Sequence, residues 1–138
     1  MNMNLIDRIN SVLSYYTFGI FGIILMIFCS VCSKKMSIGL LYNIYQSIFI
    51  SVILTCISAI YSFLFNVIMK LSFDLSFLKN ALTNFDIFLN RTPIFFTFTL
   101  TGFIVFSLAT YLSIFALLGK KSYLPFVSEV ISANTGVK

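Results

Sequence analysis

The sequence predicts an all-α integral membrane protein with three transmembrane helices and one amphipathic interfacial helix. Three apolar runs support this prediction, at residues 9–33, 36–69 and 93–118, and none contains Asp, Glu, Lys, Arg or His. Of the 138 residues, 59% are hydrophobic and 9% are charged. Soluble domains carry about 25% charged residues. Because a chain of this size cannot hide so much apolar surface in a water-soluble core, we expect it to lie in a bilayer.

The first transmembrane helix is predicted over residues 11–33. It follows a polar N-terminal segment, residues 1–10, and ends at the basic pair Lys34 and Lys35. A cleaved signal peptide is the alternative for this run, but the N-terminal region has little net positive charge and no A-x-A cleavage site follows. We therefore expect the helix to be retained.

The second transmembrane helix is predicted over residues 39–69 and is the longest. Its 31 residues would extend about 46 Å as a helix, whereas crossing the hydrocarbon core takes roughly 20 residues. We therefore expect it to tilt or to project beyond one interface.

Small hydroxyl residues recur along this second helix at spacings of three and four, so they share one helical face. Such a face favours close helix packing and interhelical hydrogen bonds. The alternative is that each hydroxyl bonds to a carbonyl of its own helix. Together with glycines of the other two runs, we interpret these residues as a helix-packing seam: Ser47, Ser51, Thr55, Ser58, Ser62, Gly19, Gly22 and Gly102.

Residues 70–92 follow the pattern of an amphipathic helix. Apolar residues recur at spacings of four and three, and polar residues, including Asp86, occupy the opposite arc. Since the segment carries little charge, we expect it to lie along the bilayer interface or to pack under a neighbouring helix. Its apolar face consists of Leu71, Leu75, Leu78, Leu82, Phe85 and Leu89.

The third transmembrane helix is predicted over residues 93–118, with Pro93 in its first turn. Gly119 provides a C-cap, and the basic pair Lys120 and Lys121 follows. Residues 119–138 form a basic tail that we expect to be flexible.

The two basic pairs serve as topology anchors in this prediction. Three crossings place Lys34 and Lys35 on the same side as Lys120 and Lys121, and the positive-inside rule makes that side cytoplasmic. The C-terminus is then cytoplasmic, while the N-terminus and the amphipathic segment lie on the opposite side. This topology places five Lys and Arg residues on the cytoplasmic side and four on the opposite side.

The chain lacks residue patterns typical of catalysis, metal binding or cofactor binding. It has no histidine and no glycine-rich phosphate loop, and its four acidic residues are scattered. Cys29 and Cys32 form a C-x-x-C pair, but a structural zinc site needs four ligands. Acylation of these thiols remains an alternative. We predict no enzyme, no cofactor, no metal and no small-molecule substrate, and scattered cations argue against nucleic acid as a partner.

The layout of the segments resembles that of a known family. A first apolar helix closes with Ser33-Lys34-Lys35, and an amphipathic stretch that starts at Leu71-Ser72-Phe73 runs to Asn90-Arg91-Thr92-Pro93. A third apolar helix with a basic end follows. This layout, over about residues 15–121, resembles the small minor coat proteins at the adsorption-protein end of filamentous phages. The resemblance implies a helical structural protein that waits in the bacterial inner membrane and joins the virion during extrusion.

Other function classes remain open beside this resemblance. One is an accessory subunit of a larger membrane complex. Another is an immunity protein against a pore-forming bacteriocin, because such proteins are also small, basic and rich in Phe, Ile, Leu and Ser. A passive pore lined by the hydroxyl face is a third. In each case we expect the partners to be the lipid bilayer and other membrane helices, in a homo- or hetero-oligomer.

Overall fold

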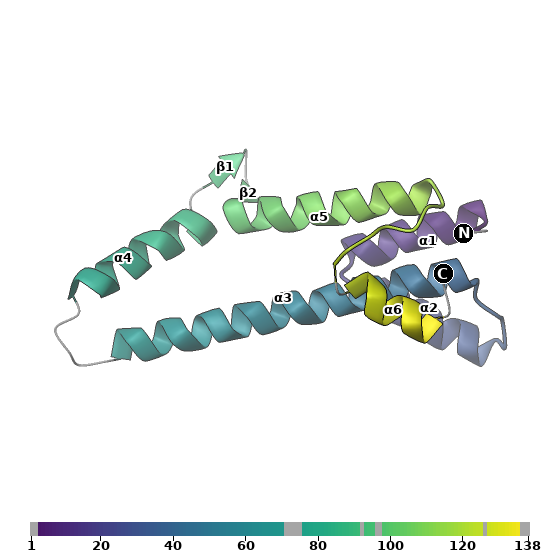
Figure 1. The fold of residues 1–138 in the computed structure, drawn as a ribbon, viewed down its shortest axis with the longest axis horizontal. Helices are drawn as coiled ribbons and strands as arrows, with labels where there is room; N and C mark the ends of the chain where they lie inside the picture. The colour runs from purple at the N-terminus through teal and green to yellow at the C-terminus, as the bar shows by residue number, and fades with distance from the viewer. Residues whose placement is uncertain (1–2, 71–75, 92, 96–97, 126, 136–138) are drawn as a thin grey trace. The chain divides into compact units, whose positions relative to one another are not determined.

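The computed structural model describes residues 3–70, 76–91, 93–95, 98–125 and 127–135. Over these residues the chain is helical except for one short hairpin (Figure 1). Its contacts divide it into two compact units. The first unit comprises Met1–Ile53 and Leu108–Lys138, and the second comprises Leu54–Ser107.

Two helices are long and apolar enough to cross a membrane, by length and composition. They are α3, with 33 residues from Ile38 to Lys70, and α5, with 18 residues from Leu100 to Leu117. At 1.5 Å per residue they extend about 50 Å and 27 Å. No proline interrupts α3, and its single glycine lies in the first turn, so the helix continues over the whole apolar run.

The first apolar run does not form the transmembrane helix predicted over residues 11–33. It forms two helices of 12 residues each, α1 (Leu5–Tyr16) and α2 (Ile20–Val31). Each extends only about 18 Å, whereas the hydrocarbon core of a bilayer is about 30 Å thick. The described chain therefore has two candidate membrane spans where the sequence predicted three.

Two successive residues with left-handed backbone separate α1 from α2. Phe18 has a φ of 52° and Gly19 a φ of 85°. They close α1 with a Schellman motif, in which the Gly19 N–H donates to the Ser14 carbonyl at 2.8 Å and the Phe18 N–H to the Tyr15 carbonyl at 3.2 Å. Hydrophobic periodicity does not reveal this break, because the residues on both sides of it are apolar.

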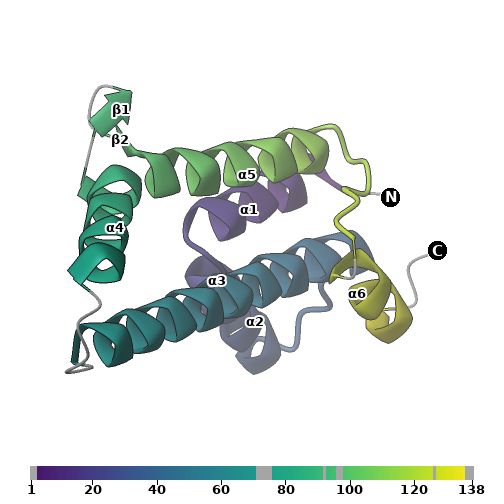
Figure 2. The same ribbon diagram turned by 60° about the vertical axis from the view of Figure 1, so that its left-hand side comes forward.

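α1 packs parallel to the first half of α3 (Figures 1 and 2). Asn43 Nδ2 donates to the Ser11 hydroxyl at 3.0 Å, and one turn further along both helices the Ser14 and Ser47 hydroxyls are 2.6 Å apart. The contacts advance together along the two helices, so their directions agree.

α2 runs antiparallel to the same part of α3. Gly19 lies against Ile48, and Gly22 lies against Ile44, so the contacts move backwards along α3 as α2 advances. A Cβ on Gly22 would approach Ile44 Cγ2 to 2.7 Å, which shows how closely the two helices pack. α1 and α2 therefore form a helical hairpin, with the start of α1 and the end of α2 at the same end.

The predicted amphipathic helix over residues 70–92 is divided among several elements. Lys70 ends α3, and α4 covers Ser76–Asp86. A π-helical turn, η1, then covers Ile87–Arg91. Residues 71–75 and 92 lie outside the described part of the chain.

A short antiparallel hairpin precedes α5, so the third apolar helix begins at Leu100 and not at Pro93. Strand β1 (Pro93–Phe95) pairs with β2 (Phe98–Thr99), with Pro93 opposite Thr99. Residues 93–99 contain only Pro and β-branched or aromatic residues, which favour an extended backbone. The charge-free run at residues 93–118 thus contains a β-hairpin followed by a helix.

The C-terminal tail, which we expected to be flexible, forms the helix α6 (Val127–Thr135). Val127 and Ile131, one turn apart, are buried against Tyr42 of α3. This packing stabilises the helix, although its own sequence is only mildly apolar. The sequence did not predict this helix because its packing partner, Tyr42, is more than eighty residues away in the chain.

We predict that Gly19→Ala destabilises the first unit by about 2 kcal/mol or more. A left-handed residue with a side chain costs about 1–2 kcal/mol, and the added Cβ would lie 2.7 Å from Ile48 Cγ1. Thermal unfolding in detergent micelles, followed by circular dichroism, measures the loss. Gly102→Ala, inside α5, is the matched control and should change stability by no more than about 1 kcal/mol. Equal effects at the two glycines would contradict the assigned role of Gly19.

Candidate functional site

Polar side chains fill much of the interior of the first unit, while large apolar side chains lie on the surface. Ile20 is 64% exposed, Ile27 60% and Val31 80% along α2, and α3 and α5 expose apolar side chains in the same way. Exposed apolar surface of this extent, beside buried polar groups, differs from the pattern of a water-soluble protein. Eight of the described polar residues are buried, and all except Ser113 form what we call the polar core: Ser11, Ser14, Asn43, Gln46, Ser47, Ser122 and Ser128.

Gln46 is the centre of the polar core. Its Oε1 accepts hydrogen bonds from the Tyr15 hydroxyl at 2.7 Å and from the Ser122 hydroxyl at 2.8 Å. Its Nε2 donates to the Ser128 hydroxyl at 3.4 Å. One side chain of α3 therefore links α1, the segment that follows α5, and α6.

Asn43, one turn before Gln46, makes a second set of bonds. Its Nδ2 donates to Ser11 Oγ at 3.0 Å, and its Oδ1 lies 3.1 Å from the Tyr15 hydroxyl. The Ser11 hydroxyl in turn donates to the Asp7 carbonyl at 2.8 Å. A buried polar group without a partner costs about 1–3 kcal/mol, so these pairings decide whether the helices can pack here.

Ser113 of α5 is an exception. Its hydroxyl is buried and has no hydrogen-bond partner within the described residues. The neighbouring buried residues of that helix face, Ala109, Leu112 and Ala116, are apolar. The buried face of α5 in the first unit therefore contributes mainly apolar contact. The polar links of this helix lie elsewhere on it, from Thr110 to the Tyr16 hydroxyl and from the Leu117 carbonyl to Arg8.

The predicted seam is divided by the structure. Gly19, Gly22 and Ser47 lie at contacts between the hairpin and α3. Ser51 is half-buried, as is Gly102 on α5. The remaining seam residues are exposed in the structure: Thr55, Ser58 and Ser62.

The sequence interpretation missed most of the polar core. Asn43 and Gln46 are three residues apart near the start of the second apolar run, and the predicted seam contains neither of them. The available signal was their spacing, which places both on the face of Ser47 and Ile50. Their partners Ser122 and Ser128 gave no signal, because they lie in the tail.

The predicted topology anchors differ in their surroundings. Lys34, Lys35 and Lys120 are exposed. Lys121 is half-buried: its Nζ donates to the Ser132 hydroxyl at 2.6 Å and lies 5.5 Å from the centroid of the Tyr42 ring. Lys121 therefore also helps to hold α6 against α3.

The predicted apolar face of residues 70–92 is described only in part, since Leu71 and Leu75 lie outside the described residues. Leu78 and Phe85 are exposed, and Leu82 and Leu89 are half-buried.

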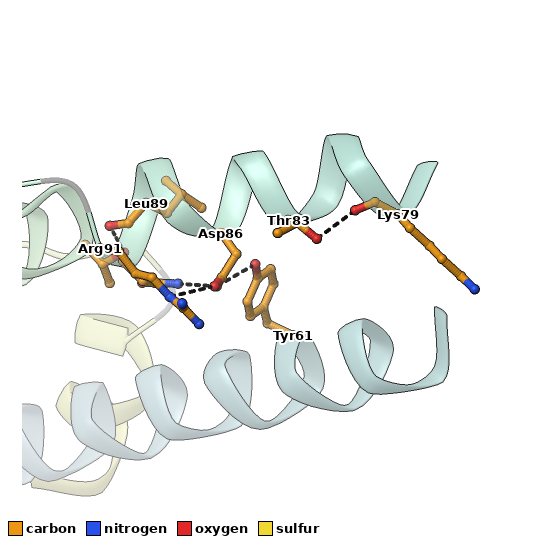
Figure 3. A network of polar contacts seen from close by, with 8 residues as sticks. Tyr61, Lys79, Thr83, Asp86, Leu89 and Arg91 are labelled. Atoms are coloured by element: carbon orange, nitrogen blue, oxygen red, sulfur yellow. Dashed lines mark hydrogen bonds and ion pairs between the residues drawn. The ribbon is translucent and has the colours of Figure 1, made fainter. Parts of the chain in front are cut away.

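Asp86, which the sequence placed on the polar arc, is half-buried at the end of α4. It accepts hydrogen bonds from the Tyr61 hydroxyl at 3.2 Å and from Asn90 Nδ2 at 2.9 Å, and Arg91 Nε is 3.7 Å from its carboxylate (Figure 3). The π-helical turn brings Arg91, five residues on, over Asp86. The carboxylate is thus fully occupied by structural contacts.

The arrangement of these groups is suited to holding helices together. Over the described residues, no three of the His, Cys, Asp and Glu side chains gather as metal ligands would, and Cys29, Cys32 and Cys56 are free thiols. The amides and hydroxyls of the polar core bond to one another. These hydrogen bonds fix the positions of α1, α3 and α6 relative to one another.

Comparisons with known proteins add no relative. No protein-family model matches the chain, and no curated protein or solved structure matches it. The class of protein is therefore defined by the fold alone. It is a small all-helical protein with two helices long and apolar enough to cross a membrane.

We predict that Gln46→Leu destabilises the first unit by about 2–4 kcal/mol, because it removes three hydrogen bonds and deprives the buried Ser122 hydroxyl of its acceptor. Unfolding in detergent, followed by circular dichroism, provides the measurement. Ser58→Ala is the matched control on the same helix. Since Ser58 is exposed, its replacement should change stability by less than about 0.5 kcal/mol. A Gln46→Leu variant as stable as this control would show that the polar core does not hold the unit together.

Proposed function

We propose that the protein is an integral membrane protein in which α3 and α5 cross the bilayer, and that it acts as a non-enzymatic assembly subunit. The observation that carries the proposal is the distribution of side chains. In the first unit the groups of the polar core pair with one another, while the surfaces of α2, α3 and α5 are apolar. Lipid is the solvent in which such a surface is stable.

Polar contacts along α3 support one particular span. Tyr42 donates to the Ser122 carbonyl at 3.2 Å, and Tyr61 donates to Asp86. The helix from Tyr42 to Tyr61 has 20 residues, the number that crosses a hydrocarbon core of about 30 Å. Tyrosines at both ends suit the two interfaces, where aromatic residues with a polar tip are enriched. Asp86 then lies outside the hydrocarbon core.

α4 supplies a surface for assembly. Phe77, Phe85 and Phe88 are 84%, 52% and 52% exposed, and Ala81 between them is exposed as well. Their spacing places them on one face of the helix, which we call the aromatic face. Asp86 lies on the other side, where it accepts a hydrogen bond from Tyr61. An exposed aromatic face of this kind suits contact with another membrane helix.

A minor coat protein of a filamentous phage is the particular assembly that the layout of the chain favours. Such a protein would wait in the inner membrane until the particle is extruded. It needs complementary helix faces and no catalytic group. An accessory subunit of a membrane complex would use the same surfaces, and the identity of the bound partner distinguishes the two. An immunity protein would bind a pore-forming toxin.

Membrane insertion predicts resistance to alkaline extraction. After treatment of isolated membranes with sodium carbonate, the protein should stay in the pellet, because two apolar spans hold it there. A peripheral membrane protein of the same cells, measured in parallel, serves as the control and should be released. Release of this protein into the supernatant would contradict the proposal.

Assembly through the aromatic face predicts crosslinking from α4. A photoreactive phenylalanine at position 77 should give an adduct with another protein in the intact membrane. The same residue at Thr83, which is exposed on a different side of α4, is the control and should give less. Mass spectrometry of the adduct and of purified filaments identifies the partner. Equal yields at the two positions, or adducts with lipid alone, would argue against this surface.

A further inference from the structure

We infer that α1 and α2 form a re-entrant hairpin, which enters the bilayer from the side of the two basic pairs and leaves it on that same side. Its outer surface would contact lipid acyl chains. The inference rests on the proposed membrane insertion of α3 and α5. It concerns the segment that the sequence predicted to be the first transmembrane helix, residues 11–33.

The two ends of the hairpin lie at the basic end of the spanning helices. Arg8, in the first turn of α1, donates to the Leu117 carbonyl at 3.1 Å, and its guanidinium lies against Gly119. These residues end α5 directly before Lys120. At its other end, α2 is joined to the start of α3 by a loop that contains Lys34 and Lys35. The hairpin therefore begins and ends on one side.

The tip of the hairpin reaches only part of the way along α3. Gly19 at the tip lies against Ile48, six residues after Tyr42 at the near end of the proposed span, which corresponds to about 9 Å of helix. Tyr61, the far end of the proposed span, is more than a dozen residues further along. The hairpin thus extends towards the middle of a hydrocarbon core of about 30 Å and turns back.

The turn at the tip is suited to an apolar surrounding because the backbone N–H groups of residues 17–21 are paired. The Ile20 N–H donates to the Thr17 carbonyl at 3.1 Å, and the Phe21 N–H donates to the Thr17 hydroxyl at 3.1 Å. The Schellman bond from Gly19 closes α1. An unpaired backbone group in hydrocarbon costs several kcal/mol, and these bonds remove that cost for the tip.

The two helices of the hairpin differ in polarity, as expected if α2 faces lipid and α1 faces the polar core. α2 contains no charged residue and exposes Ile20, Ile24, Ile27 and Phe28 at 60% or more. Its one buried residue is Gly22, which faces α3. α1 instead buries its serines in the polar core and carries its charges in its first turn, at the membrane surface. Acyl chains are the partner that α2 fits.

The hairpin changes the distribution of charge across the membrane. Three crossings would leave five cations on one side and four on the other. With a hairpin, Arg8 moves to the side of the basic pairs, so the count becomes six against three, which agrees better with the positive-inside rule. Both termini are then cytoplasmic. The six cations are Arg8, Lys34, Lys35, Lys120, Lys121 and Lys138, and the three are Lys70, Lys79 and Arg91.

Labelling of single cysteines with a membrane-impermeant maleimide tests the inference in the full-length protein. The native cysteines are first replaced by serine, and a cysteine is then introduced by Asn4→Cys, Met36→Cys, Asn84→Cys or Phe18→Cys. We expect positions 4 and 36 to label only in inverted vesicles and position 84 only in intact spheroplasts. A cysteine at position 18 should not be labelled from either side, because the tip lies in the hydrocarbon core.

The outcomes separate the hairpin from the membrane proposal. If position 4 labels from the side of position 84, α1 and α2 cross the membrane and the inference is wrong, while α3 and α5 still span. If position 18 labels as readily as position 4, the hairpin lies outside the bilayer. If positions 36 and 84 label from the same side, α3 does not cross, and the proposed function fails with it.

Discussion

The hydrogen bonds of Gln46 are the interactions on which the first unit depends. One amide side chain bonds to Tyr15, Ser122 and Ser128, which belong to segments that are far apart in the chain. In an apolar surrounding no water is present to replace these bonds, so each bond fixes a position as well as adding stability. α1, the tail and α6 therefore have one arrangement against α3 in which every member of the polar core is paired.

The same constraint explains why α3 tolerates polar residues in an apolar run. Asn43, Gln46 and Ser47 share one face, and the hairpin and the tail cover that face with matching hydroxyls. Beyond Ser51 the hydroxyl face continues, and Thr55 and Ser58 are exposed. The small residues in the first half of the helix allow the hairpin to pack closely against α3.

Much of the architecture could be predicted from the sequence, because it depends on local composition. The charge-free runs located α3 within one residue of each predicted end, and Gly119 marked the end of α5 through its left-handed backbone. Within the candidate site, the sequence pointed to Ser47, Gly19 and Gly22. It did not identify Gln46 as the centre of the polar core. The hydrogen bonds of this amide come from hydroxyl groups that are distant in the sequence, and only the fold brings them close.

By itself, the sequence determined that the chain is helical and that its charges lie between long apolar runs, since both follow from residue type and period. Only the tertiary structure decided how the first run is used. Phe18 and Gly19 permit a turn but do not require one, and a straight helix would satisfy the same periodicity. The turn is favoured by the close approach of Gly19 and Gly22 to α3 and by the bonds from Ser14 and Tyr15 to that helix. Such contacts join residues about thirty positions apart, so no local pattern in the sequence encodes them.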